Sequence, residues 1–265
     1  DYIKAKILLL IVLFSLFIAS AAALDITEDT VTLTVDYADF TEEDQDHITE
    51  SGQFTVTNDG AEDVTVSFTI DSLPSSYILE PIADVTLTAG ASSTVSFTLK
   101  IPHKKDEGVS TIGTIKATVG STQTTATLKQ NTKTMLELRE LEVEYITKDE
   151  KVERDDFSGD SQDLDLSKEV RPGSEMKLTF KLENLFHRDY DREGDITDIV
   201  LTIEADDDEV FEDDSIDGEE FDIDNIDGDK RDEYDIRFMI SDEVDEQDYT
   251  LNLLIESEDD NGAKH

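Results

Sequence analysis

The feature that most constrains the fold of this chain is a period-two alternation of apolar and hydroxyl side chains. Val31, Leu33 and Val35 are separated by Thr32 and Thr34. Successive side chains of a β-strand point to opposite faces, so this pattern predicts antiparallel strands with one buried face. No segment after residue 23 keeps a helical period. The chain is therefore predicted to be all-β beyond its first residues.

Short alternating segments recur through residues 24–134, and turn signals separate them. The turn signals are Asn58-Asp59-Gly60, Ala89-Gly90, Pro102 and Gly120. The expected strands lie near residues 31–35, 54–56, 64–70, 85–87, 95–101, 115–119 and 126–128. About seven short strands at this spacing are typical of an immunoglobulin-like β-sandwich.

A second set of alternating segments predicts a second, acidic immunoglobulin-like sandwich over residues 135–265. Its strands are expected near residues 136–145, 176–182, 199–203, 221–223, 234–240 and 249–255. The first of them changes phase between Leu138 and Leu141, which indicates a bulge in an edge strand. The acidic stretch from Lys148 to Leu166 is expected to be an insertion.

The second sandwich has one apolar segment fewer than the first. No further apolar run follows Tyr249 to Glu256 before His265. That strand is therefore expected to have an open edge, completed either by a later segment of a longer chain or by a strand from a partner.

Acidic residues dominate the charge of the chain. The formal net charge is -44. Residues 135–265 hold 47 acidic and 14 basic residues, a net of -33, whereas residues 1–134 hold 19 and 8, a net of -11. Such a chain repels phosphate backbones, which excludes nucleic acid as a partner, and it attracts cations. We expect copies to approach one another only when salt or divalent cations screen this charge.

The first 23 residues have the order of a secretory signal peptide. Lys4 and Lys6 precede a mainly apolar run over residues 7–18, and small residues fill Ala19 to Ala23. This order predicts export and cleavage near Ala23. A retained membrane anchor or pilin-type stem remains the alternative, because residues 7–23 reach the lower end of the roughly 17 to 25 residues that span a bilayer.

Three features of the chain together resemble S-layer proteins of small-genome archaea. They are the export segment followed by Leu24-Asp25-Ile26-Thr27-Glu28-Asp29, the turn Phe54-Thr55-Val56-Thr57-Asn58-Asp59-Gly60, and the ladder Phe221-Asp222-Ile223-Asp224-Asn225-Ile226-Asp227-Gly228-Asp229. In that family a signal peptide precedes two immunoglobulin-like modules, of which the second is very acidic. The resemblance covers nearly the whole chain. It implies an N-terminal hydrophobic helix at 1–23 and tandem β-sandwiches at 24–134 and 135–265.

The best candidate for an ion site is the segment from Asp213 to Asp224, which partly matches a calcium-loop pattern. Asp213, Ser215 and Asp217 fall at alternate positions, and Asp224 lies where a twelve-residue calcium loop places its bidentate acid. The pattern departs from that loop because Glu220 occupies a usually apolar position. A solvated acidic loop is the alternative reading. Ca²⁺ is the cofactor that this pattern suggests.

The sequence offers no pattern of catalytic residues. His47, His103, His187 and His265 occur singly, and we expect them in loops. The sequence contains no Gly-rich phosphate loop, zinc motif or nucleophile elbow. We therefore expect no enzymatic activity.

These patterns predict a structural protein of the extracellular cell surface. It would be a subunit of an archaeal S-layer or similar coat, in contact with copies of itself and with other envelope components. It would meet the membrane only through its N-terminal segment or through a C-terminal anchor beyond this sequence. Two alternatives stay open: a binding or accessory module of a larger exported enzyme or adhesin, and a pilin-like filament subunit.

Overall fold

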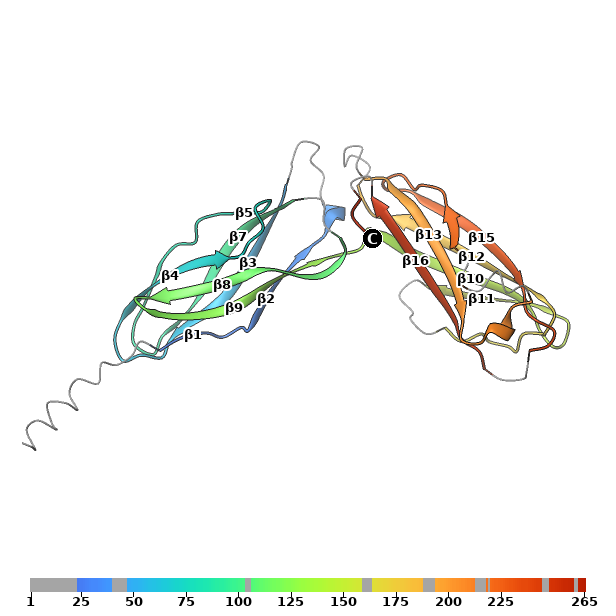
Figure 1. The fold of residues 1–265 in the computed structure, drawn as a ribbon, viewed down its shortest axis with the longest axis horizontal. Helices are drawn as coiled ribbons and strands as arrows, with labels where there is room; N and C mark the ends of the chain where they lie inside the picture. Colours follow the sequence, from blue (N-terminus) through green and yellow to red (C-terminus); the bar gives the residue numbers. More distant parts are fainter. Residues whose placement is uncertain are drawn as a thin grey trace, which may run out of the picture. The chain divides into compact units, whose positions relative to one another are not determined.

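A computed structural model describes residues 23–39, 47–102, 106–158, 164–187, 194–212, 218, 220–244, 248–259 and 262–265 (Figure 1). The regular elements in these ranges are β-strands and two 3-10 turns, η1 (Tyr37–Asp39) and η2 (Asp208–Val210). No helix within these ranges is long and apolar enough to cross a membrane. The N-terminal segment at residues 1–22 lies outside them.

The strands form two compact units. Over the described residues, unit 1 comprises residues 23–35, 47–102 and 108–131, and unit 2 comprises residues 36–39, 106–107 and those from 132 onward. Unit 2 therefore begins close to the predicted domain start at Met135. It also includes two short segments that precede and follow strands of unit 1.

Unit 1 is a two-sheet β-sandwich. Its strands are β1 (Leu24–Ile26), β2 (Thr30–Val35), β3 (His47–Asn58), β4 (Val64–Asp71), β5 (Ile78–Leu79), β6 (Val85–Leu87), β7 (Ser92–Pro102), β8 (Gly108–Val119) and β9 (Thr122–Thr132). One sheet has the order β1-β3-β7-β5 and the other the order β2-β9-β8-β4-β6. The seven predicted strands are present, and β1 and β5 are additional short ones.

Unit 2 is also a two-sheet β-sandwich. Its strands are β10 (Leu136–Ile146), β11 (Val152–Ser158), β12 (Glu175–Asn184), β13 (Ile196–Ala205), β14 (Glu220–Ile223), β15 (Arg231–Met239) and β16 (Leu251–Asp259). One sheet has the order β11-β10-β12-β15 and the other the order β14-β13-β16. The chain is thus all-β over its described residues, and its units have an immunoglobulin-like sandwich architecture.

The first strand of unit 2 differs from its prediction in one respect. The expected bulge is present, since the register of β10 against β12 shifts between Leu138 and Glu140. The expectation that this strand lies at an edge was wrong, because β11 pairs with it on the side away from β12. Strand β11 forms inside the predicted acidic insertion. None of its side chains is fully buried, so it lacks the apolar alternation that marks the other strands.

The cores lie between the two sheets of each unit. In unit 1 the side chains of Val56, Leu99, Ile101, Ile115 and Leu128 are completely inaccessible to solvent. In unit 2 the same is true of Phe180, Leu182, Leu201 and Ile203. These residues occupy alternate positions of their strands, as the sequence pattern predicts. Burial of each such side chain contributes about 1.5 to 3 kcal/mol.

The two units differ in whether a late strand has neighbours on both sides. In unit 1 the last but one strand, β8, lies between β4 and β9. In unit 2, β16 pairs with β13, and no other strand among the described residues lies on its far side. Strand β16 therefore leaves an edge of its sheet open.

Candidate functional site

Most of the predicted calcium loop, namely Asp213, Ser215 and Asp217, lies outside the described residues. Asp224 is exposed directly after β14, and its backbone carbonyl accepts a 3.1 Å hydrogen bond from the Tyr234 hydroxyl. Burial, reinforced by the negative charge of Asp232, raises the pKa of Tyr234 to about 12. The hydroxyl therefore keeps its proton at neutral pH. The end of the loop is held to β15 through its backbone, and the calcium site stays a prediction.

The sheet β11-β10-β12-β15 carries rows of paired charges. Its strands contain six basic residues: Arg139, Arg154, Lys177, Lys181, Arg231 and Arg237. The cross-strand register places them beside acids. Lys181 Nζ lies 2.9 Å from Glu140, and Lys177 Nζ lies 2.8 Å from Asp235. Each exposed pair contributes about 0 to 1 kcal/mol, so the main effect is to offset part of the acidic charge of these strands.

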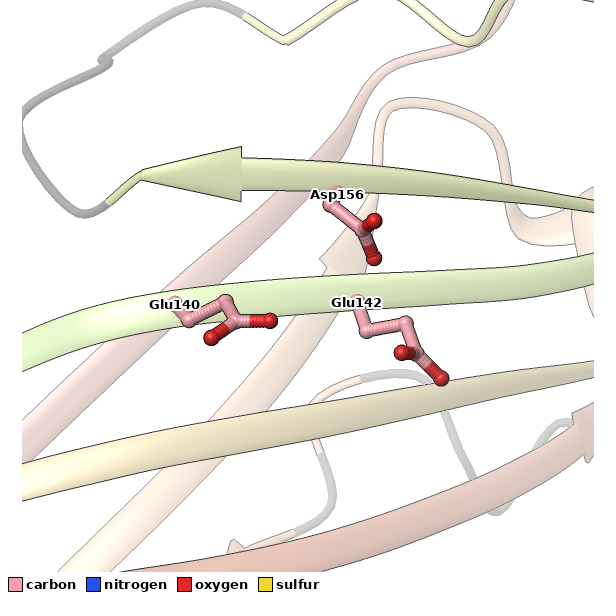
Figure 2. Close-up of side chains that lie close together, drawn as sticks. All are labelled: Glu140, Glu142 and Asp156. Atoms are coloured by element: carbon pink, nitrogen blue, oxygen red, sulfur yellow. The ribbon is translucent and has the colours of Figure 1, made fainter.

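Figure 2 shows three acids that come close together on this sheet. Carboxylate oxygens of Glu140 and Glu142 on β10 and Asp156 on β11 all lie within 4.8 Å of one another. Carboxylates are the ligands that Ca²⁺ prefers. However, Arg154 lies 3.1 Å from Glu142, and Lys181 lies 2.9 Å from Glu140. Basic groups already compensate two of the three charges, so the cluster belongs to the ion-pair network.

The ion pairs lower the pKa values of acids on this sheet. A 2.7 Å hydrogen bond from Arg154 holds the pKa of Glu144 below its ordinary value. Burial raises the pKa of Glu183, but hydrogen bonds from Arg231 and Arg139 outweigh it and leave that pKa lowered. A lowered folded-state pKa stabilises the fold above the unfolded pKa, and this contribution is lost as pH falls through the folded pKa. The network therefore contributes at neutral pH and is lost in acid.

Tyr145 joins β10, β11 and the following loop through its hydroxyl. The side chain is 1% exposed, and its hydroxyl donates a 2.7 Å hydrogen bond to the Asp155 carboxylate. The same hydroxyl accepts a 3.1 Å bond from the backbone N–H of Lys168. The Asp155 carboxylate also accepts from the backbone N–H of Ser167 at 2.8 Å. These bonds fix Ser167 and Lys168, which precede β12, to strands β10 and β11.

The Tyr145→Phe variant is expected to lose about 1 to 2 kcal/mol of unfolding free energy, because it removes two part-buried hydrogen bonds, to Asp155 and from Lys168, while it keeps the buried ring. Urea unfolding followed by circular dichroism at pH 7 measures the loss. The Asp155→Asn variant keeps an acceptor for the hydroxyl and should lose less. Equal losses in the two variants would contradict a role for the Tyr145 hydroxyl.

The sheet β14-β13-β16 has the opposite charge pattern. Over their described lengths its three strands contain no Lys or Arg. Glu204, Glu220, Asp222 and Glu256 are all exposed on them. Leu254 is 53% exposed and lies opposite Thr202 in the register. Among the described residues, the acids of these three strands thus have no Lys or Arg beside them within their own sheet, which also carries the open edge.

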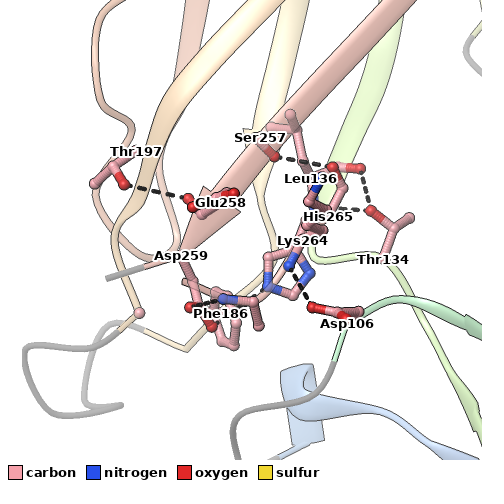
Figure 3. A network of polar contacts seen from close by, with 12 residues as sticks. Asp106, Thr134, Leu136, Phe186, Thr197, Ser257, Glu258, Asp259, Lys264 and His265 are labelled. Carbon is pink, nitrogen blue, oxygen red and sulfur yellow. Dashed lines mark hydrogen bonds and ion pairs between the residues drawn. The ribbon is translucent and has the colours of Figure 1, made fainter. Parts of the chain in front are cut away.

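The residues that follow β16 fold back onto its end (Figure 3). The backbone N–H of Asp259 donates to the carbonyl of Ala263 at 2.8 Å, and that of His265 donates to the carbonyl of Ser257 at 3.0 Å. Lys264 lies opposite Glu258 in an antiparallel bridge. Residues 257–259 therefore have neighbours on both sides, whereas residues 251–256 pair with β13 alone among the residues that the structure describes.

The described histidines occupy different settings. His265 is buried, with its ring edge-on to Phe186 at a centroid distance of 5.4 Å and its Nε2 3.4 Å from the Asp259 carboxylate. His47 begins β3, and its Nε2 donates to the carbonyl of Ser76 at 3.0 Å, so the expectation of a loop was wrong there. His187 follows Phe186 in a loop. His103 lies outside the described residues.

One buried asparagine closes an equivalent strand in each unit. Asn58 ends β3 and Asn184 ends β12, and both are 0% exposed. The Asn184 amide donates to the carbonyls of Gly194 and Ile226 at 2.6 and 2.7 Å, and its side-chain oxygen accepts from the N–H of Phe186. These side chains hold together the loops at one end of each sandwich.

A sequence pattern shared by the two units marks these two buried asparagines. Phe54-Thr-Val-Thr-Asn58 and Phe180-Lys-Leu-Glu-Asn184 share phenylalanine, an aliphatic residue and asparagine at alternate positions. Asn58 was interpreted only as part of a turn. The repetition of the pattern in the second unit is what distinguishes a structural asparagine from an ordinary turn residue.

No protein-family model and no curated protein matches this chain. Solved structures resemble it at low identity. The PapD-like domain 7 of human CEP192 is 11% identical, with a TM-score of 0.27 over 41% of this chain and 84% of its own. The YadV chaperone is 10% identical, with a TM-score of 0.28 over 91% and 96%. A chimeric titin Z1Z2 protein is 16% identical, with a TM-score of 0.26 over 90% and 95%. Scores at this level carry no argument about function, and the immunoglobulin-like architecture rests on the strand order of the two units.

Proposed function

We propose that this protein is a structural, non-enzymatic subunit of an extracellular coat of the S-layer type. It is exported through its N-terminal segment, which is removed near Ala23. Copies of the protein then associate through their sandwich units and with other envelope components. The proposal rests on the signal-peptide order of residues 1–23 and on the charge distribution of unit 2.

The observation that carries this proposal is that basic residues accompany the acids on the strands of one sheet of unit 2 but not on those of the other. One sheet pairs its acids with six basic residues, whereas strands β13, β14 and β16 contain no Lys or Arg. Acidic surfaces of this kind repel one another in dilute buffer. Divalent cations between carboxylates turn that repulsion into attraction. A calcium-rich or saline exterior would therefore control when copies associate.

Purified protein is expected to assemble into sheets in millimolar calcium and to disperse in chelator at the same ionic strength. Sedimentation and negative-stain electron microscopy measure the change. A variant that carries Glu220→Gln, Asp222→Asn and Glu256→Gln should need less calcium, because it lowers the repulsion between acidic sheets. The matched variant Glu140→Gln/Glu142→Gln alters the paired sheet and should keep the calcium requirement.

Two results would contradict the coat proposal. One is a protein that stays monomeric at every calcium concentration. The other is assembly that responds equally to neutralisation of either sheet, since Glu220, Asp222 and Glu256 would then have no special part.

A further inference from the structure

The open edge of β16 has a defined length and a defined set of free backbone groups. In a strand, neighbouring residues direct their N–H and C=O groups to opposite sides. The Thr250 carbonyl faces β13, where it accepts from the N–H of Asp206, whereas the Ser257 carbonyl faces the other side. Leu251, Leu253 and Ile255 therefore direct their N–H and C=O groups to the open side.

The side chains at this edge are incompletely covered. Leu253 and Ile255 face the core but are only half-buried, whereas Ile203 and Leu201, their partners on β13, are 0% exposed. On the outer surface Leu254 is 53% exposed. An edge with free backbone groups and uncovered apolar side chains is a template for pairing with another strand.

We propose that two copies of this protein pair through the Leu251–Glu256 edges of β16, antiparallel about a two-fold axis at Leu253. This inference rests on the proposed coat function and names one of its contacts. Leu251 then forms a hydrogen-bonded pair with Ile255 of the partner subunit, and Leu253 pairs with Leu253 of the partner subunit. Asn252 lies opposite the partner's Leu254, and the two sheets become one.

The length of the free stretch selects this register. Centred on Leu253, it pairs the whole stretch from Thr250 to Glu256 with its copy, and Glu256 lies opposite the partner's Thr250. A register centred on Asn252 would instead place Ile255 opposite the partner's Tyr249 and Glu256 opposite the partner's Asp248, both of which precede β16. A register centred on Leu254 would place Leu251 opposite the partner's Ser257, whose edge the segment 263–265 already covers. The free stretch thus fits a second copy of itself.

Disulfide cross-linking tests both the contact and its register. The chain contains no cysteine, so a single introduced thiol reports one position. In the proposed dimer, Asn252 of one copy and Leu254 of the partner subunit form a non-hydrogen-bonded pair. Their Cα atoms would lie about 4.5 Å apart, within disulfide range. Leu254 and Leu254 of the partner subunit would be diagonal neighbours about 7 to 8 Å apart, which is too far for a disulfide. We therefore expect Asn252→Cys and Leu254→Cys proteins, mixed under mild oxidation in millimolar calcium, to give roughly tenfold more linked heterodimer than either gives homodimer.

A matched control and a second variant pair complete the experiment. Thr202 lies on β13 opposite Leu254 of the same chain, inside the sheet. The Thr202→Cys protein should therefore not link to the Asn252→Cys protein. Leu253→Pro removes an N–H of the open edge and should reduce cross-linking, whereas Leu253→Ala keeps the N–H and should not. Equal amounts of heterodimer and homodimer, or no dimer, would overturn the edge contact. If calcium-dependent sheets still form in that case, the coat proposal stands without it; linked dimers that never form sheets would instead overturn the coat.

Discussion

Replacing Asn184 by alanine is expected to lower the free energy of unfolding of unit 2 by about 3 to 5 kcal/mol, because a buried polar group left without a partner costs about 1 to 3 kcal/mol. The variant removes the donor to the carbonyls of Gly194 and Ile226 and the acceptor for the N–H of Phe186. Asn184 is 0% exposed, so water does not replace these partners without opening the end of the sandwich.

Chemical unfolding with a signal specific to unit 2, such as amide hydrogen exchange of β12 and β13, measures this loss. Asn225→Ala is the matched control, because Asn225 is exposed and its loss should change stability by less than about 0.5 kcal/mol. Asn58→Ala should have a comparable effect confined to unit 1. A loss below about 1 kcal/mol in Asn184→Ala would show that the loops at this end are held by other contacts.

The strands that the sequence predicted are those in which burial itself creates the pattern. Where one face of a strand covers a core, as with Val64 to Ile70 or Met176 to Leu182, apolar residues must occur at every second position. Strand β11 has no fully buried side chain and packs Phe157 only partly buried against the core, so its pairing with β10 is decided mainly by backbone register. Nothing local in Val152 to Ser158 distinguishes such a strand from a solvated loop.

The paired charges of unit 2 required the register as well. Lys181 and Glu140 meet only because β10 and β12 pair with a bulge between Leu138 and Glu140. In the sequence they are ordinary members of a very acidic chain. The calcium-loop pattern, by contrast, is local and was easy to detect, but its best ligands lie outside the described residues. Residue spacing alone therefore suggests a calcium site, whereas the ion-pair network can be recognised only from the pairing of the strands.

Replacing Gly52 by valine is expected to cost unit 1 about 3 kcal/mol, since overpacking of a filled core typically costs 1 to 3 kcal/mol and occasionally more. Gly52 lies in β3, opposite Phe97 of β7. A Cβ atom at this position would lie 2.6 Å from Cε1 of Phe97 and 2.9 Å from Cδ2 of Leu33, both closer than real Cβ contacts. Phe97 and Leu33 are each 3% exposed, so neither has free space to move into.

The neighbouring variant Gln53→Val is the matched control for this prediction. Gln53 is exposed on the other face of the same strand, so the same new side chain should change stability by less than about 0.5 kcal/mol there. Phe97→Leu should recover part of the loss when combined with Gly52→Val, because a smaller side chain vacates the site and the two substitutions are in direct contact. Thermal unfolding of the four proteins measures these terms. A Gly52→Val protein as stable as Gln53→Val would show that the Phe97 ring does not occupy the space beside Gly52.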